Sequence, residues 1–579
     1  MAPIRIGRTH PALNLFTRGF AESVITLKLS MKKILYPVIL GLIISLAFFL
    51  RIYKVTSIPP ALNWDEVSIG YNAYSILKTG RDEWGVAFPL NFKSYGEYKL
   101  PAQIYASIPA IAIFGLNGFG VRITPVIYGI LTVLLLYLLV QEAFRKKEIS
   151  LMSAFLLAVS PWHIQLTRAS FESSFALFWI VMGIWLFLKG LKNPKWLTFS
   201  MIPFAISVYT YNSARAFVPL FLFSLAIIYW KYFWKVKKWF IAAGLLFTVL
   251  MLPLAQMVIS GEAAARYKLV SITDEKGLIP RIDERRNNSK LPAIATKLIH
   301  NRYTYVSFYF AENYFAHFTP DFLFIHGAGH RQHHVQGVGE LYWFQAPFIL
   351  MGIYFLIKKK DPNLKILAPW LFLAFVPVAM TNDSIPNALR TLNATPVYQI
   401  LTALGIYYSY KFIKSRKVFY LLIGLSALLF LLNLGVYLTN LFGYYPERYS
   451  KDWQYGNKEV VEYIKTNQDK YDLITYSRHY GEPHMFTLFY LNYDPARFQD
   501  SANLNRFETF DWVRVLQFDK YYFPDLGDTG TKYQDVVNIN PGKIILFIGR
   551  PEDFPGELPR LKTIDFLNGE RAFDIVESK

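Results

Sequence analysis

Long apolar stretches recur along this chain, and they constrain its fold more than any other feature. The first covers residues 34–52, and at about 1.5 Å of rise per helical residue it can cross a hydrocarbon core of roughly 30 Å. Further apolar spans lie at about 109–114 running into 119–140, then at 150–166, 172–189, 197–211, 214–230, 239–258, 341–357, 366–380, 388–408 and 418–441. We therefore expect an α-helical polytopic membrane protein with about 11 membrane helices.

The overall composition agrees with this class. Hydrophobic residues make up 53% of the 579 residues and charged residues only 18%, which is too apolar for a soluble protein of this size. The net charge of +20 comes from Lys and Arg between the apolar spans, where cytoplasmic loops and anionic headgroups explain them. We expect membrane lipids as partners and no nucleic acid. Cysteine is absent, so disulfides and thiol chemistry are excluded.

The basic loops predict the orientation in the membrane. Under the span assignment, one side collects Arg145–Lys147, Lys189–Lys195, Lys231–Lys238, Lys358–Lys360 and Lys411–Lys417. The positive-inside rule makes that side the cytoplasm. The N-terminus is then inside, and an odd number of spans places the C-terminus outside. We expect a multi-pass protein of the cytoplasmic (inner) membrane with its polar external loops and C-terminal part on the extracytoplasmic side.

Three regions follow from these assignments. Residues 1–32 are interpreted as a cytoplasmic arm, or as an over-extended start, because Met31 followed by two lysines and an apolar run is typical of the beginning of a bacterial membrane protein. Residues 33–442 form the membrane domain, with external loops at 53–108 and 259–340. Residues 443–579 have the composition of a soluble α/β domain, with helices expected at 456–467 and 482–492, strands at 471–477 and 543–549, and a hairpin at 561–577.

A charged stretch at 58–101 follows the first apolar span and contains the adjacent pair Asp65-Glu66. One carboxylate of such a pair can act as a general base while the other holds a cation, a hydroxyl or the local geometry. The structural alternative is a helix start, with Asn63 as the cap before an apolar-periodic segment. The two interpretations are compatible.

The segment order WDEVSIGYNAYSI, GEYKLPAQIYASIPAIAIFG and GFGVRITPVIYG resembles the GT-C membrane glycosyltransferases, with most similarity to the protein O-mannosyltransferase and lipid A aminoarabinose transferase branch. The resemblance implies a cell-envelope enzyme that transfers a sugar from a polyprenyl-phosphate carrier to an external acceptor, with inversion at the anomeric carbon. Asp65 matches the catalytic Asp of that branch, and Glu66 matches its partner. The acceptor is a lipid, a glycan or a protein, and no motif identifies the sugar.

A leaving polyprenyl phosphate requires positive charge nearby. Lys99 lies near the position of a phosphate-contacting Lys in the aminoarabinose transferases, although Ser68 stands where the family often has a basic residue. The external arginines Arg302, Arg331 and Arg390, with Arg215, are further donor-phosphate candidates, and headgroup contact is the alternative for each. Arg122 lies at an apolar span, and we expect it to pair with a carboxylate and position the loop.

Half of the ten histidines lie within the external loop at 317–334. His330, His333 and His334, with Glu97, form a possible divalent-metal site, because neutral imidazole is the commonest metal ligand. Their spacing matches no defined metal signature, so hydrogen bonding to substrate is the alternative. We assign Glu97, Tyr98, His333 and His334 to the substrate pocket.

Two other functions remain possible at this stage. A lipid-linked sugar flippase or transporter would share the composition, but neither inverted repeats nor charges spread through the spans are visible. An oligosaccharide ligase or polymerase of related fold is the second alternative.

Overall fold

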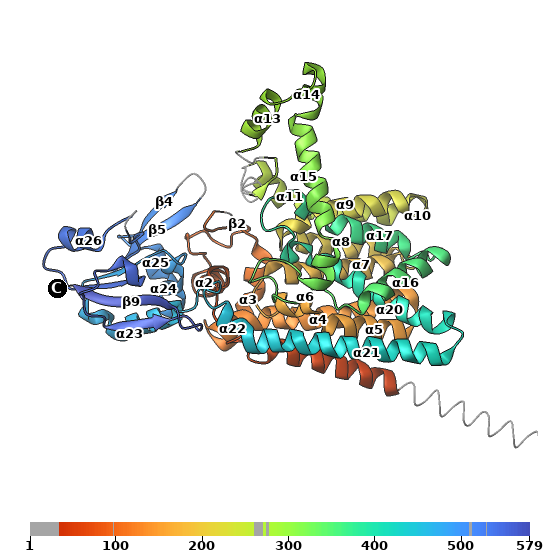
Figure 1. Ribbon diagram of the computed structural model, residues 1–579, viewed down its shortest axis with the longest axis horizontal. Helices are drawn as coiled ribbons and strands as arrows, with labels where there is room; N and C mark the ends of the chain where they lie inside the picture. The colour runs from red at the N-terminus through yellow and green to blue at the C-terminus, as the bar shows by residue number, and fades with distance from the viewer. Residues whose placement is uncertain are drawn as a thin grey trace, which may run out of the picture.

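The structure, a computed structural model, describes residues 34–96, 98–259, 270–273, 277–508, 512–527 and 530–578. It consists of a helical bundle, a sheet domain at one end of the bundle, and a helical arm that projects from the bundle's side (Figure 1). The expected arm at 1–32, Met31 and Glu97 all lie outside the described residues.

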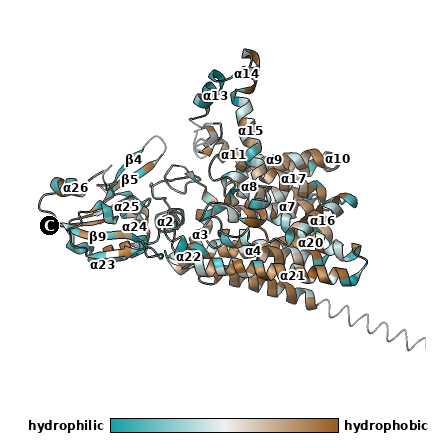
Figure 2. Cartoon of the chain, in the orientation of Figure 1, coloured by the Kyte–Doolittle hydropathy of each residue, from teal (hydrophilic) through white to brown (hydrophobic). Residues whose placement is uncertain are grey.

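The bundle is apolar along its length (Figure 2). Among the described residues, the helices long and apolar enough to cross a membrane are Ile34–Ile52, Gly118–Phe144, Glu172–Gly190, Lys237–Met257 and Arg416–Arg448. The chain is therefore a multi-pass membrane protein. Shorter apolar helices fill the remaining expected spans, so the number of about 11 membrane helices stays a prediction.

The helices of the bundle follow the expected spans closely. Their bounds are α3 Pro101–Phe114, α4 Gly118–Phe144, α5 Lys147–Ala158, α6 Pro161–Leu166, α7 Glu172–Gly190, α8 Lys195–Val208, α9 Asn212–Ile228, α10 Trp230–Lys235, α11 Lys237–Ile259, α16 Gln345–Lys358, α17 Leu364–Ala374, α18 Val376–Ala379, α19 Ala388–Thr391, α20 Thr395–Phe412 and α21 Arg416–Thr439. The expected span at 150–166 is broken between α5 and α6, because Pro161 lacks the N–H that would continue the helix.

The projecting arm consists of α13 Leu278–Asn287, α14 Ala293–Ile299 and α15 Arg302–Ala316.

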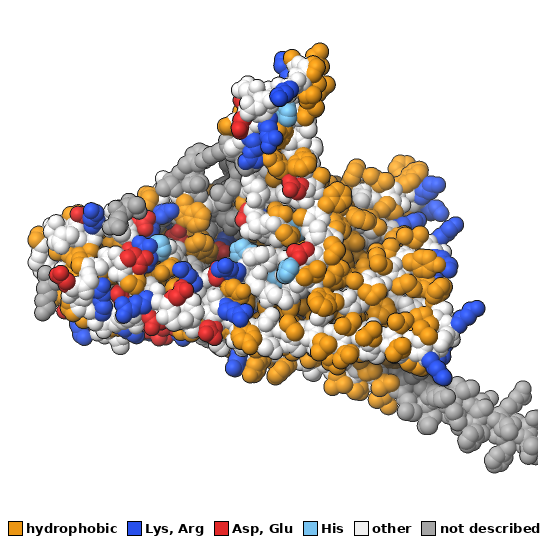
Figure 3. Space-filling model, in the orientation of Figure 1, with side chains coloured by type: hydrophobic (Ala, Val, Ile, Leu, Met, Phe, Trp, Pro, Cys, Tyr) orange, Lys and Arg blue, Asp and Glu red, His pale blue; other side chains and the backbone are white. Residues whose placement is uncertain are grey.

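Lys and Arg side chains gather at the end of the bundle opposite the sheet domain (Figure 3), near α10 and the C-terminal end of α16.

Three buried arginines fix the chain as it leaves the first helix. Arg51 donates to the carbonyls of Ala47 and Ala158, each at 3.0 Å. Arg168 donates to four carbonyls between residues 50 and 58 at 2.7 to 3.1 Å. Arg122 donates to carbonyls at 55, 59 and 61. Because each guanidinium satisfies several backbone carbonyls, the turn into the next helix is held rigidly.

That next helix, α2 Trp64–Thr79, lies between the bundle and the sheet domain (Figure 1). The short strands β1 Phe92–Lys93 and β2 Tyr98–Lys99 pair antiparallel in the same external loop. Gly70 of α2 lets Phe489 approach so closely that a Cβ would lie 2.7 Å from its ring. The core of the sheet domain therefore continues into α2, and the two fold as one packed unit.

The sheet domain has seven strands in the order β4-β5-β6-β3-β7-β9-β8, with β3 parallel to β6 and β7. Its strands are β3 Leu473–Tyr476, β4 Asn505–Glu508, β5 Val513–Phe518, β6 Tyr521–Tyr522, β7 Ile545–Gly549, β8 Lys562–Asp565 and β9 Arg571–Ser578, and its helices are α22 Tyr445–Arg448, α23 Asn457–Asn467, α24 Pro483–Tyr490, α25 Pro495–Gln499 and α26 Tyr533–Ile539. The helices, strands and hairpin expected from the sequence match α23, α24, β3, β7 and β8-β9, which confirms the α/β assignment.

Candidate active site

Two adjoining cavities lie where the bundle, the external loops and the sheet domain meet. The first, of about 510 Å³, is lined by Asp65, Tyr98, Lys99, Arg215, His330, His333, Arg390 and neighbouring residues. The second, of about 840 Å³, lies on the side of the sheet domain. Both are lined by Trp64, His330, Gln332 and Trp512. We call them the catalytic cavity and the outer cavity.

Asp65 faces the catalytic cavity from the first turn of α2. Asn63 caps this helix, because its side-chain oxygen accepts from the Glu66 N–H at 2.9 Å. The Asp65 side chain is 36% exposed, and one of its oxygens forms an ion pair with Lys99, whose side chain is only 3% exposed. The helix start and the functional interpretation of this pair therefore coexist, and Asp65 is the carboxylate of the two that substrate can reach.

Glu66 is fully buried and is held on all sides. Arg122 donates Nε to its Oε1 at 2.9 Å and Nη2 to its Oε2 at 2.8 Å, and both side chains are 0% exposed. The N–H groups of Asn63 and Ser170 donate to the same carboxylate at 3.3 and 3.0 Å. The expected pairing of Arg122 with a carboxylate is confirmed. Since its oxygens are engaged and shielded, Glu66 acts in this arrangement by positioning the start of α2.

The basic residues expected at the donor phosphate lie in different parts of the structure. Lys99 lines the catalytic cavity, and so does Arg390, whose Nη2 lies 2.5 Å from Asp383 Oδ2. Arg331 lines the outer cavity and pairs with Asp452 at 3.3 Å. Arg302 is exposed at the start of α15 in the arm and lines neither cavity. The structure thus brings Lys99 and Arg390 together with Asp65 and leaves Arg302 apart.

The histidines do not act as one group. His330 and His333 stack with ring centroids 3.7 Å apart, and both line the catalytic cavity. Burial lowers the pKa of His330 more than the nearby Asp383 raises it, so this ring is neutral near pH 7.

His334 has a different environment from the one expected. It lines neither cavity, because it is buried in an ion pair with Glu340 at 3.0 Å and its Nε2 donates to the Val338 carbonyl at 2.7 Å. Gly327, with φ +74°, packs so closely on this ring that a Cβ would lie 2.2 Å from Nε2. Both ring nitrogens are therefore engaged in holding the loop. This corrects the expected placement of His334 in the substrate pocket and in a metal set.

The described residues therefore offer few side chains that could bind a metal ion together. No group of three or more His, Asp or Glu side chains with metal-binding geometry is present in the part of the chain that the structure describes, which leaves Glu97 out. We derive no step through a metal. Tyr98 lines the catalytic cavity, as expected for a pocket residue.

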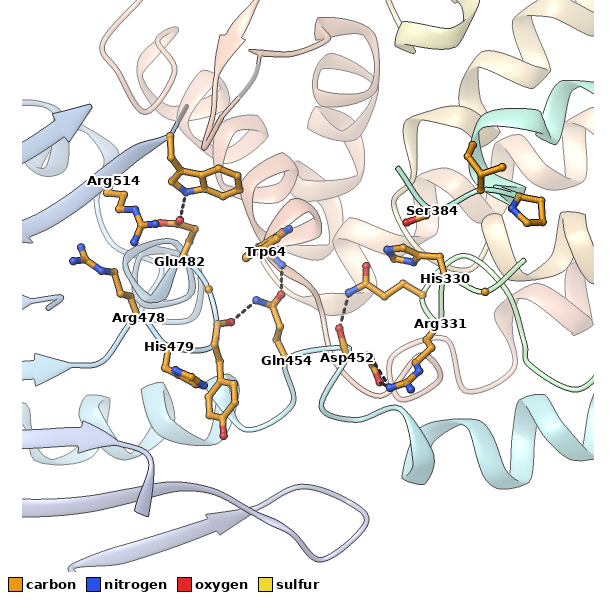
Figure 4. Close-up of a pocket in the computed structure, with 17 residues that line it drawn as sticks. Trp64, His330, Arg331, Ser384, Asp452, Gln454, Arg478, His479, Glu482 and Arg514 are labelled. Atoms are coloured by element: carbon orange, nitrogen blue, oxygen red, sulfur yellow. Dashed lines mark hydrogen bonds and ion pairs between the residues drawn. The ribbon is translucent and has the colours of Figure 1, made fainter. Parts of the chain in front are cut away.

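Sequence reasoning missed the residues by which the sheet domain reaches the site. The Trp64 N–H donates to Gln454 Oε1 at 2.8 Å, and Gln454 Nε2 donates to the Tyr480 carbonyl at 2.6 Å (Figure 4). Gly481, with φ +123°, allows the Trp64 ring to pack where a Cβ would lie 2.5 Å from it. The Gly-Glu-Pro at 481–483 indicates a turn in this loop, but it does not indicate which residues the loop contacts.

The family model that matches this chain is described as dolichyl-phosphate-mannose-protein mannosyltransferase, and it covers residues 104–256. The dolichyl-phosphooligosaccharide-protein glycotransferase 2 of Pyrococcus horikoshii is 31% identical over 152 residues, which are 25% of this chain and 19% of that protein. A putative mannosyltransferase of Bacillus subtilis, YkcB, is 23% identical over 167 residues, which are 28% of this chain and 22% of that protein. The chain thus matches about a fifth of the length of these curated relatives.

The fold comparison extends over nearly the whole chain. The crystal structure of ArnT from Cupriavidus metallidurans in the apo state superposes with a TM-score of 0.54 at 10% identity, covering 95% of this chain and 98% of ArnT. The same protein bound to undecaprenyl phosphate gives a TM-score of 0.52. Bundle and sheet domain together therefore have the arrangement found in ArnT. The chain therefore has a GT-C fold like that of ArnT, and its residues 104–256 match the mannosyltransferase family model.

Proposed function

We propose that this protein transfers a sugar from a polyprenyl-phosphate carrier to a hydroxyl or other nucleophile of an extracytoplasmic acceptor, with Asp65 as the general base. The observation that carries the proposal is the placement of Asp65. It is a partly exposed carboxylate at the start of α2, it faces a cavity of about 510 Å³, and it is paired with Lys99.

The chemistry follows from this arrangement. Asp65 accepts the proton of the acceptor hydroxyl while the acceptor oxygen forms a bond to the anomeric carbon. The bond from that carbon to the phosphate oxygen breaks on the opposite face, so the configuration inverts and polyprenyl phosphate leaves. Lys99 and Arg390 line the same cavity and stabilise the phosphate that departs.

The location of the site supports a lipid-linked donor. Lys and Arg side chains mark the opposite end of the bundle (Figure 3), which the positive-inside rule makes cytoplasmic. The cavities and the sheet domain then lie outside the cytoplasmic membrane. Nucleotide sugars are cytoplasmic, so a sugar at this site has to arrive on a lipid, and the structural neighbour ArnT has been crystallised with undecaprenyl phosphate.

The test is turnover of a panel of polyprenyl-phosphate sugars by the purified protein in nanodiscs. We expect Asp65→Asn to lower kcat/KM by about 100- to 10,000-fold, the usual contribution of a general base. Asp500→Asn is the matched control, because Asp500 is an exposed carboxylate of the sheet domain that lines neither cavity. Wild-type turnover by a folded Asp65→Asn protein would refute the assignment.

A second candidate is transfer of a whole oligosaccharide from a lipid carrier. The Pyrococcus relative favours this candidate, because its name describes a glycotransferase of dolichyl-phosphooligosaccharides. It is 31% identical to this chain over the matched residues, compared with 23% for the Bacillus relative. Mass spectrometry of the product in the same assay separates the two, because the acceptor gains either one sugar residue or several.

A further inference from the structure

The outer cavity has no role in the chemistry proposed so far. It has a volume of about 840 Å³ and lies between the external loops and the sheet domain, with Arg478, Glu482 and Arg514 on the side of the sheet domain (Figure 4). Opposite them lie His330 and Arg331 from the external loop (Figure 4). It adjoins the catalytic cavity through Trp64 and Trp512.

Two arginines of the sheet domain line this cavity, and each carries unsatisfied donors. Arg478 follows β3, and Arg514 is the second residue of β5. The Nε and Nη1 atoms of Arg478 and the Nε atom of Arg514 are shielded from solvent and have no hydrogen-bond acceptor among the described residues. A shielded N–H without an acceptor destabilises the protein, and more so when it is charged. Two partly exposed arginines with incomplete hydrogen bonding in one cavity wall are typical of a site that an anion completes.

The carboxylates nearby do not neutralise these two side chains. Glu482 accepts a hydrogen bond from Trp512 Nε1 at 2.6 Å and lies 3.4 Å from His484 Nδ1. Within the described part of the chain, no carboxylate forms an ion pair with either arginine, and Arg478 instead stacks on Phe507.

The two guanidinium groups also repel each other. Burial lowers the pKa of Arg478, and the positive charge of Arg514 lowers it further, which outweighs the opposite effect of Asp525, Glu482 and Tyr522. Across the cavity, Arg331 is already paired with Asp452. An anion between Arg478 and Arg514 would relieve both the repulsion and the missing hydrogen bonds.

The position of this pair relative to Asp65 connects it to the reaction. The segment 478–482 that carries Arg478 is tied to the start of α2, because Gln454 bridges the Trp64 N–H and the Tyr480 carbonyl. Trp64 directly precedes Asp65 and lines both cavities. The outer cavity therefore meets the catalytic cavity at the residue that precedes Asp65.

We propose that the outer cavity binds the acceptor, and that it does so through an anionic group of that acceptor, a phosphate or a carboxylate, held by Arg478 and Arg514. The role as acceptor site rests on the proposed function, whereas the anion site does not. Planar guanidinium groups bind both kinds of anion through paired hydrogen bonds, so the acceptor is predicted to be an acidic lipid or glycan, or an acidic peptide segment.

Binding is tested first without turnover. Full-length protein in nanodiscs of zwitterionic lipid is titrated with inorganic pyrophosphate and, separately, with citrate, following tryptophan fluorescence because Trp64 and Trp512 line the cavity. We expect Arg478→Gln/Arg514→Gln to weaken binding at least about 10-fold, which corresponds to about 1.4 kcal/mol. The pair Lys543→Gln/Arg571→Gln removes the same charge from exposed positions outside both cavities and is expected to bind as wild type.

Each outcome of this experiment decides something. If only pyrophosphate binds in an arginine-dependent way, the anionic group of the acceptor is a phosphate. If only citrate does, that group is a carboxylate. Equal binding by wild type and the double glutamine variant overturns the proposal, as does the failure of wild type to bind either probe at millimolar concentration. Arg478→Lys/Arg514→Lys keeps the charge without the paired geometry, and it is expected to bind with intermediate strength if both arginines contact the anion.

A second measurement separates this proposal from the proposed function. Radiolabelled polyprenyl-phosphate sugar is supplied with or without an envelope extract from cells that lack the protein, and hydrolysis of the donor is measured beside transfer to the extract. We expect Arg478→Gln/Arg514→Gln to hydrolyse donor at the wild-type rate while transfer falls at least about 10-fold through a higher KM for the extract. Unchanged transfer overturns the acceptor site alone, whereas wild type inert toward every donor overturns the proposed function instead.

Discussion

The buried pair Arg122–Glu66 allows a quantitative test of how the start of α2 is held. Both side chains are 0% exposed, and the guanidinium contacts both oxygens of the carboxylate. Arg122→Met leaves the Glu66 charge buried without its cation, which costs about 3–5 kcal/mol in measured cases. Each backbone carbonyl that loses its Arg122 donor adds roughly 1 kcal/mol.

The double variant Glu66→Leu/Arg122→Met removes both charges together. The double variant has no buried unpaired carboxylate, so it is expected to be more stable than Arg122→Met alone. Because the double variant lacks this cost of about 3–5 kcal/mol, we expect a coupling energy of about 3 kcal/mol between the two positions, at the upper end of the range for residues in contact.

The assay is reversible unfolding by SDS in bicelles, with the free energy of unfolding read from tryptophan fluorescence for wild type, both single variants and the double variant. Lys146→Met is the control, because it removes an exposed cation and is expected to change stability by no more than about 0.5 kcal/mol. A coupling energy below about 0.5 kcal/mol would refute the reasoning, because it would show that the pair does not hold this turn.

Two further predictions concern single side chains. Lys99→Met removes the cation paired with Asp65, and we expect kcat/KM for the lipid-linked donor to fall about 100-fold while the melting temperature changes little; an unchanged kcat/KM would contradict a role for Lys99 at the phosphate. Burial alone would lower the pKa of His334, but Glu340 and the Val338 carbonyl outweigh it and raise that pKa above its usual value. The stabilisation from this pair is therefore complete below about pH 6.5 and is lost as pH rises through the raised value. We expect the difference in melting temperature between wild type and His334→Gln to be larger at about pH 6 than at about pH 9, and a difference that grows with pH would contradict this.

The elements that depend on local pattern could be predicted from the sequence. Apolar length predicted the helices of the bundle, and alternating or continuous apolar runs predicted β3, β7 and the β8-β9 hairpin. Asn63 was identified as a cap because capping depends on residues three positions apart. The pairing of Arg122 was also predictable, since an unpaired cation at an apolar span is costly.

The parts of the site that depend on distant contacts could not be predicted. His330, His333 and His334 lie close together in the sequence, but only the folded loop shows which rings face a cavity. His334 does not, because Gly327 and Glu340 pack against it. Nothing local marks Gln454 or Arg478, because their partners lie elsewhere in the chain or are absent from it. The sequence therefore indicated the candidate carboxylate Asp65 better than the surfaces that surround it.

The shared core of α2 and the sheet domain also imposes an order of events during synthesis. Trp64 and its partner Gln454 are 390 residues apart, so at about 5–20 residues per second the ribosome adds the intervening chain in roughly 20–80 s. Throughout that time α2 lacks the strands and helices that complete its packing. The packing around α2 is therefore completed only when the C-terminal domain has folded, so a chain truncated before that domain is expected to leave one face of α2 uncovered.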